Sequence, residues 1–230
     1  MQNTKPTIQN TANPPRVILV WDFPTRLFHW LLVILVIISF ATGDIGGNAM
    51  QYHKLSGFAI LVLILFRLIW GFVGSGESRF ATFLKDPFAV IRYAMTLLRK
   101  DSPHYLGHNP LGGWSIIALL LTLLVQASTG LFANDDIATE GPLYAWVTKA
   151  TSDGLTRIHR LNQELIIALV SIHVLAVLFY FFYKGENLIK PMITGVKQWS
   201  GAEPEPATGR TRMAAAVAGL VGLAVYFLVR

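Results

Sequence analysis

The stretch HRLNQELIIALVSIHV, residues 159–174, decides the fold of this chain. It leads into an apolar run at residues 161–183, and a membrane-spanning helix needs about 20 such residues. Histidines stand fourteen residues apart in it, at positions 159 and 173. Fourteen helical residues rise by about 21 Å and turn to about 40° short of four full turns. The stretch therefore predicts a spanning helix that carries His159 and His173 on nearly the same face, at two depths.

Four further runs are apolar enough to cross a membrane, at residues 27–40, 55–73, 111–133 and 213–229. Of the 230 residues, 53% are hydrophobic and 14% charged, whereas a soluble domain carries about a quarter charged residues. We therefore expect an all-α integral membrane protein with a four-helix transmembrane bundle and a fifth, C-terminal transmembrane helix. The expected divisions are a disordered tail at 1–16, a membrane domain at 17–197, a linker at 198–212 and the additional helix at 213–230.

Lysine and arginine are unevenly distributed between the two sides that these spans define. Fourteen of the nineteen lie in the tail and in the loops after the second and fourth spans. Cytoplasmic loops retain such residues, so the sequence predicts a cytoplasmic N-terminus, with the protein surrounded by lipid. The net charge of +6 thus reflects orientation, and no nucleic acid partner is expected.

Two loops carry recognisable features. Residues 86–100 begin with Asp86 and a proline, a favourable helix start, and predict a short cytoplasmic helix on the bilayer surface. Residues 134–158 form an acidic outer loop with four carboxylates, from Asp135, Asp136, Glu140 and Asp153.

Four of the six histidines lie at or inside spans, where ionisable residues are costly and commonly functional. His53 is expected to open the second helix level with His159, which opens the fourth. His29 lies about 22 Å below the outer end of the first helix, at the depth of His173. The sequence thus predicts an outer pair, His53 with His159, and an inner pair, His29 with His173. The other two, His104 and His108, are expected to be solvated loop residues.

Two stacked histidine pairs inside a helical bundle suit two non-covalent haem groups, each with two axial imidazoles. The absence of cysteine excludes disulfides, thiolate-held iron–sulfur clusters and covalently attached c-type haem. A zinc or copper transport site is the competing use, but it needs three or four ligands at one point, which the 21 Å spacing forbids for the set. Unrelated packing roles remain open.

Several other residues are candidates for contact with such a cofactor. Gly57 lies one turn after His53, and Gly43 and Gly130 lie in the outer parts of their spans; helix packing explains glycine equally well. Cations at suitable depths for haem propionates are Arg26, Arg67, Lys54, Arg157 and Arg160. Each of them is equally explained as an anchor at the membrane interface.

Three motifs resemble a known family. VWDFPTRLFHW (20–30), the 159–174 stretch and ENLIKPMITG (186–195) are similar to segments of the bacterial cytochrome b561 family and the related b-type cytochrome subunits of nickel–iron hydrogenases. The resemblance covers about residues 17–197. It implies a four-helix membrane bundle with two b haems, whose ligands by position are His29, His53, His159 and His173. The fifth span lies outside the family pattern.

The function implied is electron transfer, because iron with two axial imidazoles has no open coordination position. The resemblance implies exchange with a membrane quinone, and the acidic outer loop suits a cationic periplasmic partner such as a c-type cytochrome. Three functions remain open: a quinone-linked electron carrier, the haem-bearing membrane anchor of a larger dehydrogenase such as a nickel–iron hydrogenase, and a superoxide:quinone oxidoreductase.

Overall fold

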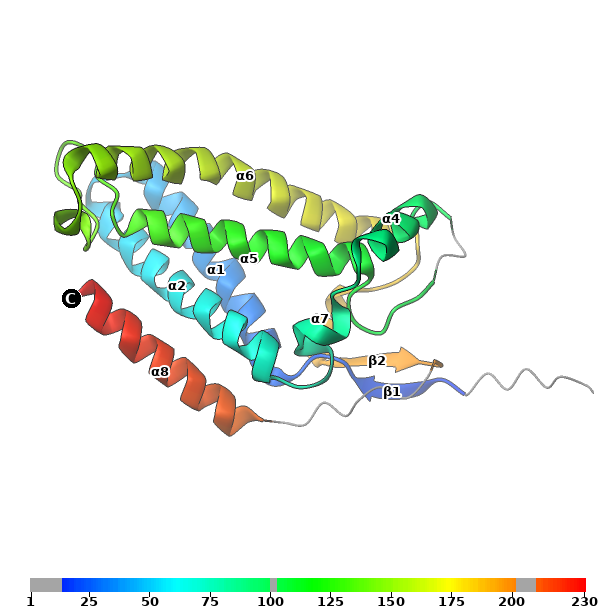
Figure 1. Cartoon of the computed structure of the whole chain (residues 1–230). Coiled ribbons are helices and arrows are strands. Elements are labelled where there is room, and N and C mark those ends of the chain that lie inside the picture. Colours follow the sequence, from blue (N-terminus) through cyan, green and yellow to red (C-terminus); the bar gives the residue numbers. More distant parts are fainter. Residues whose placement is uncertain (1–13, 100–102, 202–209) are drawn as a thin grey trace, which may run out of the picture.

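Five long apolar helices dominate the computed structural model, which describes residues 14–99, 103–201 and 210–230 (Figure 1). The helices that form the bundle and its flank are α1 (Phe23–Ile45), α2 (Met50–Val73), α5 (Pro110–Gly130), α6 (Lys149–Phe182) and α8 (Thr211–Val229). Their length and composition suffice for crossing a membrane. The fold predicted from the sequence, a membrane bundle with an additional C-terminal helix, is confirmed.

The bundle consists of two helical hairpins. Helices α1 and α2 pack together, α5 packs with α6, and the two hairpins are joined mainly where α2 meets α5. Within the apolar windows, 44% of the residues of α2 are buried, against 6% for α1 and 11% for α6. Helix α2 is therefore the central helix, and α1 and α6 are the least buried of the five.

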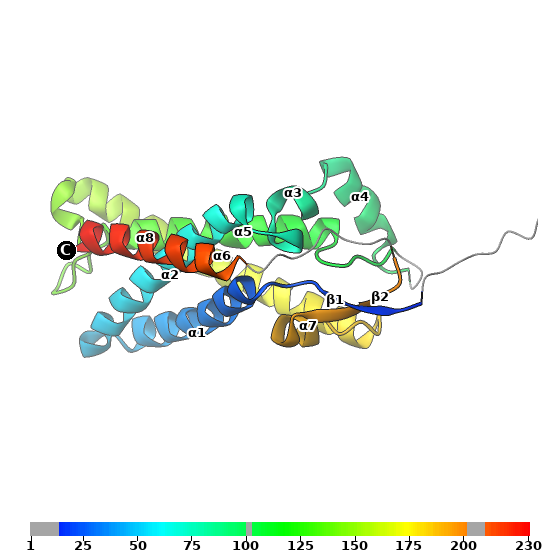
Figure 2. The ribbon, with the colours of Figure 1, turned by 90° about the horizontal axis from the view of Figure 1, so that it is seen from below.

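Helix α8 lies along the outside of α2 (Figures 1 and 2). Its buried residues are Ala214, Val221 and Val225, and they pack into the same apolar clusters as α2 and α5. The fifth helix thus covers the bundle flank farthest from α6.

The short elements gather at one end of the bundle. They are β1 (Arg16–Leu19), η2 (Gly76–Ser78), α3 (Phe80–Phe83), α4 (Pro87–Thr96), α7 (Ile189–Thr194) and β2 (Val196–Trp199). We call this the ribbon end. The opposite end carries the α1–α2 turn with η1 (Gly47–Ala49), and the connection at 131–148 with η3 (Tyr144–Trp146); we call it the loop end (Figure 1).

The antiparallel ribbon of β1 and β2 was not expected from the sequence. Its register pairs Arg16 with Trp199 and Leu19 with Val196. Beyond the ribbon, the carbonyl of Gly195 accepts from the amides of Val20 at 2.8 Å and Trp21 at 3.1 Å. The ribbon therefore ties the chain just before α1 to the chain just after α7.

Helix boundaries differ from the apolar runs in one place that concerns the histidines. Helix α6 begins at Lys149, capped by the Thr148 side chain, which accepts from the Thr151 amide. The expectation that His159 opens its helix is therefore wrong: ten helical residues precede it. The acidic segment expected to be a loop as far as residue 158 is helical from Lys149 onward, because a hydrophobic run reports the apolar part of a helix and not its polar extension.

At the ribbon end, Asp22 is the residue that fixes the start of α1. Its carboxylate accepts from the Thr25 amide at 2.9 Å as the helix N-cap and from Trp70 Nε1 of α2 at 3.1 Å. Only 3% of Asp22 is exposed, and Trp70 is fully buried. One carboxylate thus both begins α1 and joins it to the end of α2.

We predict that Asp22→Ala lowers the apparent Tm in detergent more than Asp86→Ala, which removes the exposed N-cap of α4. Losing a cap costs about 1 kcal/mol, and at Asp22 the buried Trp70 N–H is left without its acceptor, which adds about 1–3 kcal/mol. Thermal unfolding followed by circular dichroism measures both variants. Equal losses would show that the Trp70 bond adds nothing to the cap.

Candidate functional site

Four histidines of the bundle come together as two pairs. At the loop end, His53 of α2 faces His159 of α6, with ring centres 6.1 Å apart and ring planes at 81°. Toward the ribbon end, His29 of α1 faces His173 of α6, with centres 6.5 Å apart and planes at 51°. We call them the loop-end pair and the ribbon-end pair. They lie about 21 Å apart along α6, so one helix contributes a ring to each.

The separations within the pairs match two imidazoles on opposite sides of one metal ion. An imidazole nitrogen binds a metal at about 2 Å, and it lies about 1 Å from its ring centre, so two such rings have centres about 6 Å apart. All four histidines are half-buried, which leaves part of each ring open to a group bound between the helices. The residues present therefore fit a haem with two axial histidines at each pair.

In the loop-end pair, backbone carbonyls hold both rings. His53 Nδ1 donates to the carbonyl of Ser39 at 2.8 Å, and His159 Nδ1 donates to the carbonyl of Gln126 at 2.9 Å. Because a carbonyl only accepts, Nδ1 carries the proton in both rings. The other nitrogen, Nε2, is then the one left with a lone pair for a metal.

The two carbonyls sit in the same local sequence on α1 and α5. Ser39 is followed by Thr42 and Gly43, and Gln126 is followed at the same spacing by Thr129 and Gly130. Each threonine hydroxyl donates to the carbonyl four residues earlier, at 2.6 Å for Thr42 and 2.7 Å for Thr129. The same hydroxyls lie 3.3 Å and 3.1 Å from the carbonyls that the histidines use. We call these two arrangements the Thr-Gly cradles.

Each glycine of a Thr-Gly cradle gives a histidine ring the room to approach. A Cβ on Gly43 would lie 2.9 Å from His53 Nδ1, and a Cβ on Gly130 would lie 3.0 Å from His159 Cε1. Real Cβ atoms essentially never approach as closely as the first of these distances. The sequence pointed to both glycines without distinguishing this role from helix packing. The repeated spacing of Ser or Gln, Thr and Gly is the signal that identifies it.

The ribbon-end pair has different surroundings. Within the described residues, His29 Nδ1 is buried without a hydrogen-bond partner, and the ring meets Trp30 edge-on at 5.0 Å. Arg67 of α2, 3% exposed, keeps a buried Nη1 that also has no partner there. Its guanidinium lies 5.0 Å from the ring centre of Phe80. The buried carboxylate of Asp22 is an opposite charge that acts on Arg67, and the Nη1 atom remains available to a further acceptor.

The expectation that His108 is a solvated loop residue is wrong. Its ring packs between Trp21 at 4.7 Å and Phe83 at 4.8 Å, and its Nδ1 is buried. Burial is the main cause that lowers the pKa of His108 to about 3, and the positive charge of Arg67 lowers it further. His108 is therefore neutral at physiological pH. His104 is exposed, as expected, and lies 3.4 Å from Glu186.

The remaining predicted site residues are spread over both ends. Arg26 donates through Nη1 to the carbonyl of Ile193 at 2.5 Å and so joins α1 to α7. Arg157 and Arg160 line an open hollow of about 330 Å³ at the loop end. A Cβ on Gly57 would meet no atom within 4 Å, so that surface of α2 is open.

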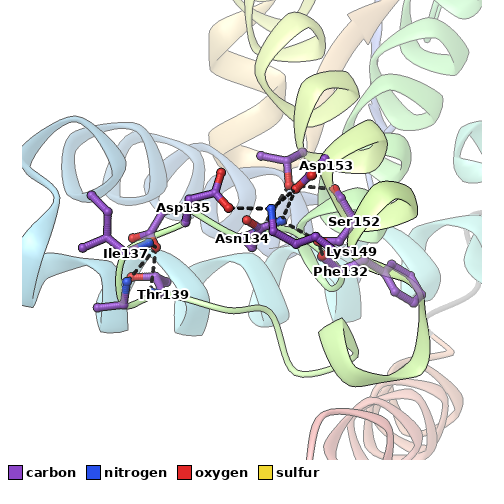
Figure 3. Close-up of polar contacts among 11 residues, drawn as sticks. Phe132, Asn134, Asp135, Ile137, Thr139, Lys149, Ser152 and Asp153 are labelled. Carbon is purple, nitrogen blue, oxygen red and sulfur yellow. Dashed lines mark hydrogen bonds and ion pairs between the residues drawn. The ribbon is translucent and has the colours of Figure 1, made fainter.

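The acidic connection at the loop end is largely internally paired (Figure 3). Asp135 accepts from the amides of Ile137, Ala138 and Thr139 at 2.8–2.9 Å, and these bonds hold the pKa of Asp135 well below its usual range. A depressed carboxyl pKa stabilises the folded loop at neutral pH, and this contribution is lost as the pH falls.

Two more carboxylates of the connection share one cation. Lys149 Nζ lies 2.5 Å from Asp136 and 2.6 Å from Asp153, and Asn134 bonds both Ser152 and Asp153 (Figure 3). The exposed negative charge of this surface is therefore smaller than the sequence suggests.

The competing metal-transport site finds no support in the described ranges of the chain, where no three or more His, Asp or Glu side chains converge on one point. Imidazoles paired two by two inside a bundle of membrane-spanning helices define instead the class of membrane-bound b-type cytochromes.

Comparison with known proteins identifies the family. Residues 20–195 match the family model described as prokaryotic cytochrome b561, and the chain belongs to this family. It is thus a multi-pass membrane b-type cytochrome that binds haem b and takes part in electron transfer. No solved structure matches it.

Three curated relatives are similar over most of their length, and each is named a probable Ni/Fe-hydrogenase B-type cytochrome subunit. The Escherichia coli K12 protein, of hydrogenase 1, is 25% identical over 77% of this chain and 89% of its own. The Azotobacter vinelandii protein is 23% identical over 86% of this chain and 95% of its own. The Bradyrhizobium diazoefficiens protein is 23% identical over 78% of this chain and 85% of its own.

We predict that Gly43→Ala and Gly130→Ala each weaken haem retention at the loop-end pair, because the added methyl displaces the ring that the cradle holds. Gly154→Ala on α6 is the matched control, since a Cβ there meets no atom within 4 Å. Haem content per chain and the optical spectrum of the purified variants measure the effect. Full haem content in both cradle variants would show that the close approach is not required.

Proposed function

We propose that this protein binds two b haems, one between His53 and His159 and one between His29 and His173. It then transfers single electrons between a redox partner at the loop end and a quinone in the membrane. The observation that carries the proposal is the pair of ring separations, 6.1 and 6.5 Å, on four helical residues at two levels of one bundle.

The bound haems supply one-electron chemistry, and the chain supplies ligands, orientation and an apolar surrounding. The carbonyls of Ser39 and Gln126 orient the loop-end rings. Cations for the propionates come from Arg26 and Arg67 toward the ribbon end and from Arg157 and Arg160 at the loop end, and Gly57 leaves room beside His53. Arg67 has the strongest support, because its buried Nη1 lacks an acceptor among the described residues.

The proposed orientation places the ribbon end in the cytoplasm of a bacterium and the loop end outside the inner membrane. Most arginines and lysines of the chain belong to the segments at the ribbon end, and cytoplasmic segments are the ones that retain these residues. The loop-end pair then lies near the outer surface, within reach of a periplasmic partner.

A hydrogenase-type subunit is the partner that the comparisons favour, because the relatives carry that name and match this chain over most of their length. A cationic c-type cytochrome is the second candidate, supported by the acidic loop-end connection. Copurification of a large soluble subunit from native membranes selects the first. Reduction of the haems by superoxide without any protein partner would select a superoxide:quinone oxidoreductase instead.

We predict two haems per chain and selective losses. His173→Ala and His29→Ala each remove the same spectral component, and His159→Ala and His53→Ala each remove the other. Pyridine haemochrome quantification and low-temperature optical spectra measure both. A stoichiometry other than two, or loss of one common component in His53→Ala and His173→Ala, would contradict the proposed pairing.

We predict that a cationic electron donor senses the loop-end carboxylates. Combining Asp136→Asn with Glu140→Gln should lower the rate of haem reduction by a basic c-type cytochrome at low salt and flatten its salt dependence. Asp135 is left unchanged because its bonds hold the loop. Asp86→Asn is the control, because it neutralises an exposed carboxylate at the ribbon end and keeps a good N-cap. An unchanged salt dependence rejects this docking surface.

A further inference from the structure

The two histidine pairs differ in what their Nδ1 nitrogens meet. Both rings of the loop-end pair donate to helix carbonyls, His53 at 2.8 Å and His159 at 2.9 Å. Across the described ranges, neither His29 nor His173 forms a hydrogen bond, and the Nδ1 of His29 is buried. The four proposed ligands are therefore not equivalent.

An Nδ1–H bond to a carbonyl makes the opposite nitrogen of an imidazole a stronger electron donor. A stronger donor stabilises the oxidised, more positively charged iron over the reduced iron, and hydrogen bonding around the ligands is one of the means by which proteins set haem potentials. Two such bonds act together on the loop-end pair. They lower the potential of a haem held there relative to one held by His29 and His173.

The buried charge of Arg67 acts in the same direction. This guanidinium is 3% exposed and belongs to the ribbon-end half of α2, and a buried positive charge favours the reduced state of a nearby iron because it is little screened. The buried carboxylate of Asp22 acts on the same guanidinium and offsets part of its charge. Arg160, near His159, opposes this difference, but it is exposed and its field is weakened by solvent.

We propose that the Thr-Gly cradles make the loop-end haem the low-potential site of the protein, with the carbonyls of Ser39 and Gln126 as the groups that set it. Electrons entering at the loop end then move downhill toward the ribbon-end haem. This inference rests on the proposed pairing of the histidines, and it adds an order of potentials that the pairing alone does not imply.

Spectroelectrochemistry on the purified full-length protein tests the order. His173→Ala and His29→Ala keep only the loop-end haem, and His159→Ala and His53→Ala keep only the other. Each site is thus measured in two independent variants and assigned in the wild type. We expect the midpoint potential of the ribbon-end haem to be the higher one. The electron should prefer that haem at least tenfold, which corresponds to a potential difference of about 59 mV for one electron. Equal or reversed potentials would overturn the proposal.

A second variant separates hydrogen bonding from charge. Arg67→Gln removes the buried charge, and Arg67→Lys retains it as the matched control. If the cradle bonds set the loop-end site, the loop-end haem keeps the lower potential in Arg67→Gln, while the difference narrows. If Arg67→Gln abolishes the difference and Arg67→Lys restores it, charge alone is responsible and the role of the carbonyls is wrong.

The electron paramagnetic resonance spectrum of the oxidised protein gives an independent readout of the cradles. Gly43→Ala and Gly130→Ala should alter the signal of the loop-end haem, by shift or by loss, and leave that of the ribbon-end haem in place. Two haems with unequal spectra but equal potentials would overturn this inference alone. If the single-histidine variants do not remove separate haems, the proposed function on which this inference rests is overturned as well.

Discussion

The structure depends on one geometric constraint, the placement of two histidines fourteen residues apart on a single straight helix. Because α6 turns nearly four times between His159 and His173, both rings face the same side of the bundle. The helices that face α6 must then place one histidine opposite His159 and another opposite His173. Helix α1 does so with His29 near the ribbon end, and α2 does so with His53 near the loop end. The hairpin of α1 and α2 provides both because its two helices run in opposite directions.

This constraint explains how the rest of the chain is used. The antiparallel pair α1–α2 must be fixed in register against α6, and the ends of the helices supply the fixing contacts. Asp22 joins the start of α1 to Trp70 near the end of α2. Lys197 of β2 bonds Glu186 at 2.6 Å and the carbonyl of Tyr105 at 2.7 Å. The ribbon end therefore ties each hairpin together, and the pairing of β1 with β2, together with the bond from Arg26 to the carbonyl of Ile193, joins the two hairpins to each other.

The spanning helices and the levels of the histidines were predictable because they depend on local quantities, namely apolar length and helical rise. Features that depend on long-range pairing were not. Strands of four residues such as β1 and β2 have no periodic pattern of their own and form only because residues 16 and 199 meet. The burial of His108 likewise follows from Trp21 and Phe83, which are distant in sequence. The early start of α6 does not follow from hydrophobicity, because its first ten residues, KATSDGLTRI, contain no continuous apolar run.

The Thr-Gly cradles show how a histidine is oriented where a charged partner is expensive. In soluble sites a carboxylate often accepts from the outer nitrogen of a ligand histidine, but a carboxylate inside a membrane carries a large desolvation cost. A helix carbonyl is neutral and has two lone pairs, of which the helix uses one. The residue four positions after the carbonyl is the one whose Cβ would crowd a histidine ring that approaches this carbonyl. At both loop-end sites that residue is glycine: Gly43 for Ser39 and Gly130 for Gln126. The bundle thus obtains its acceptors from its own backbone without burying a charge.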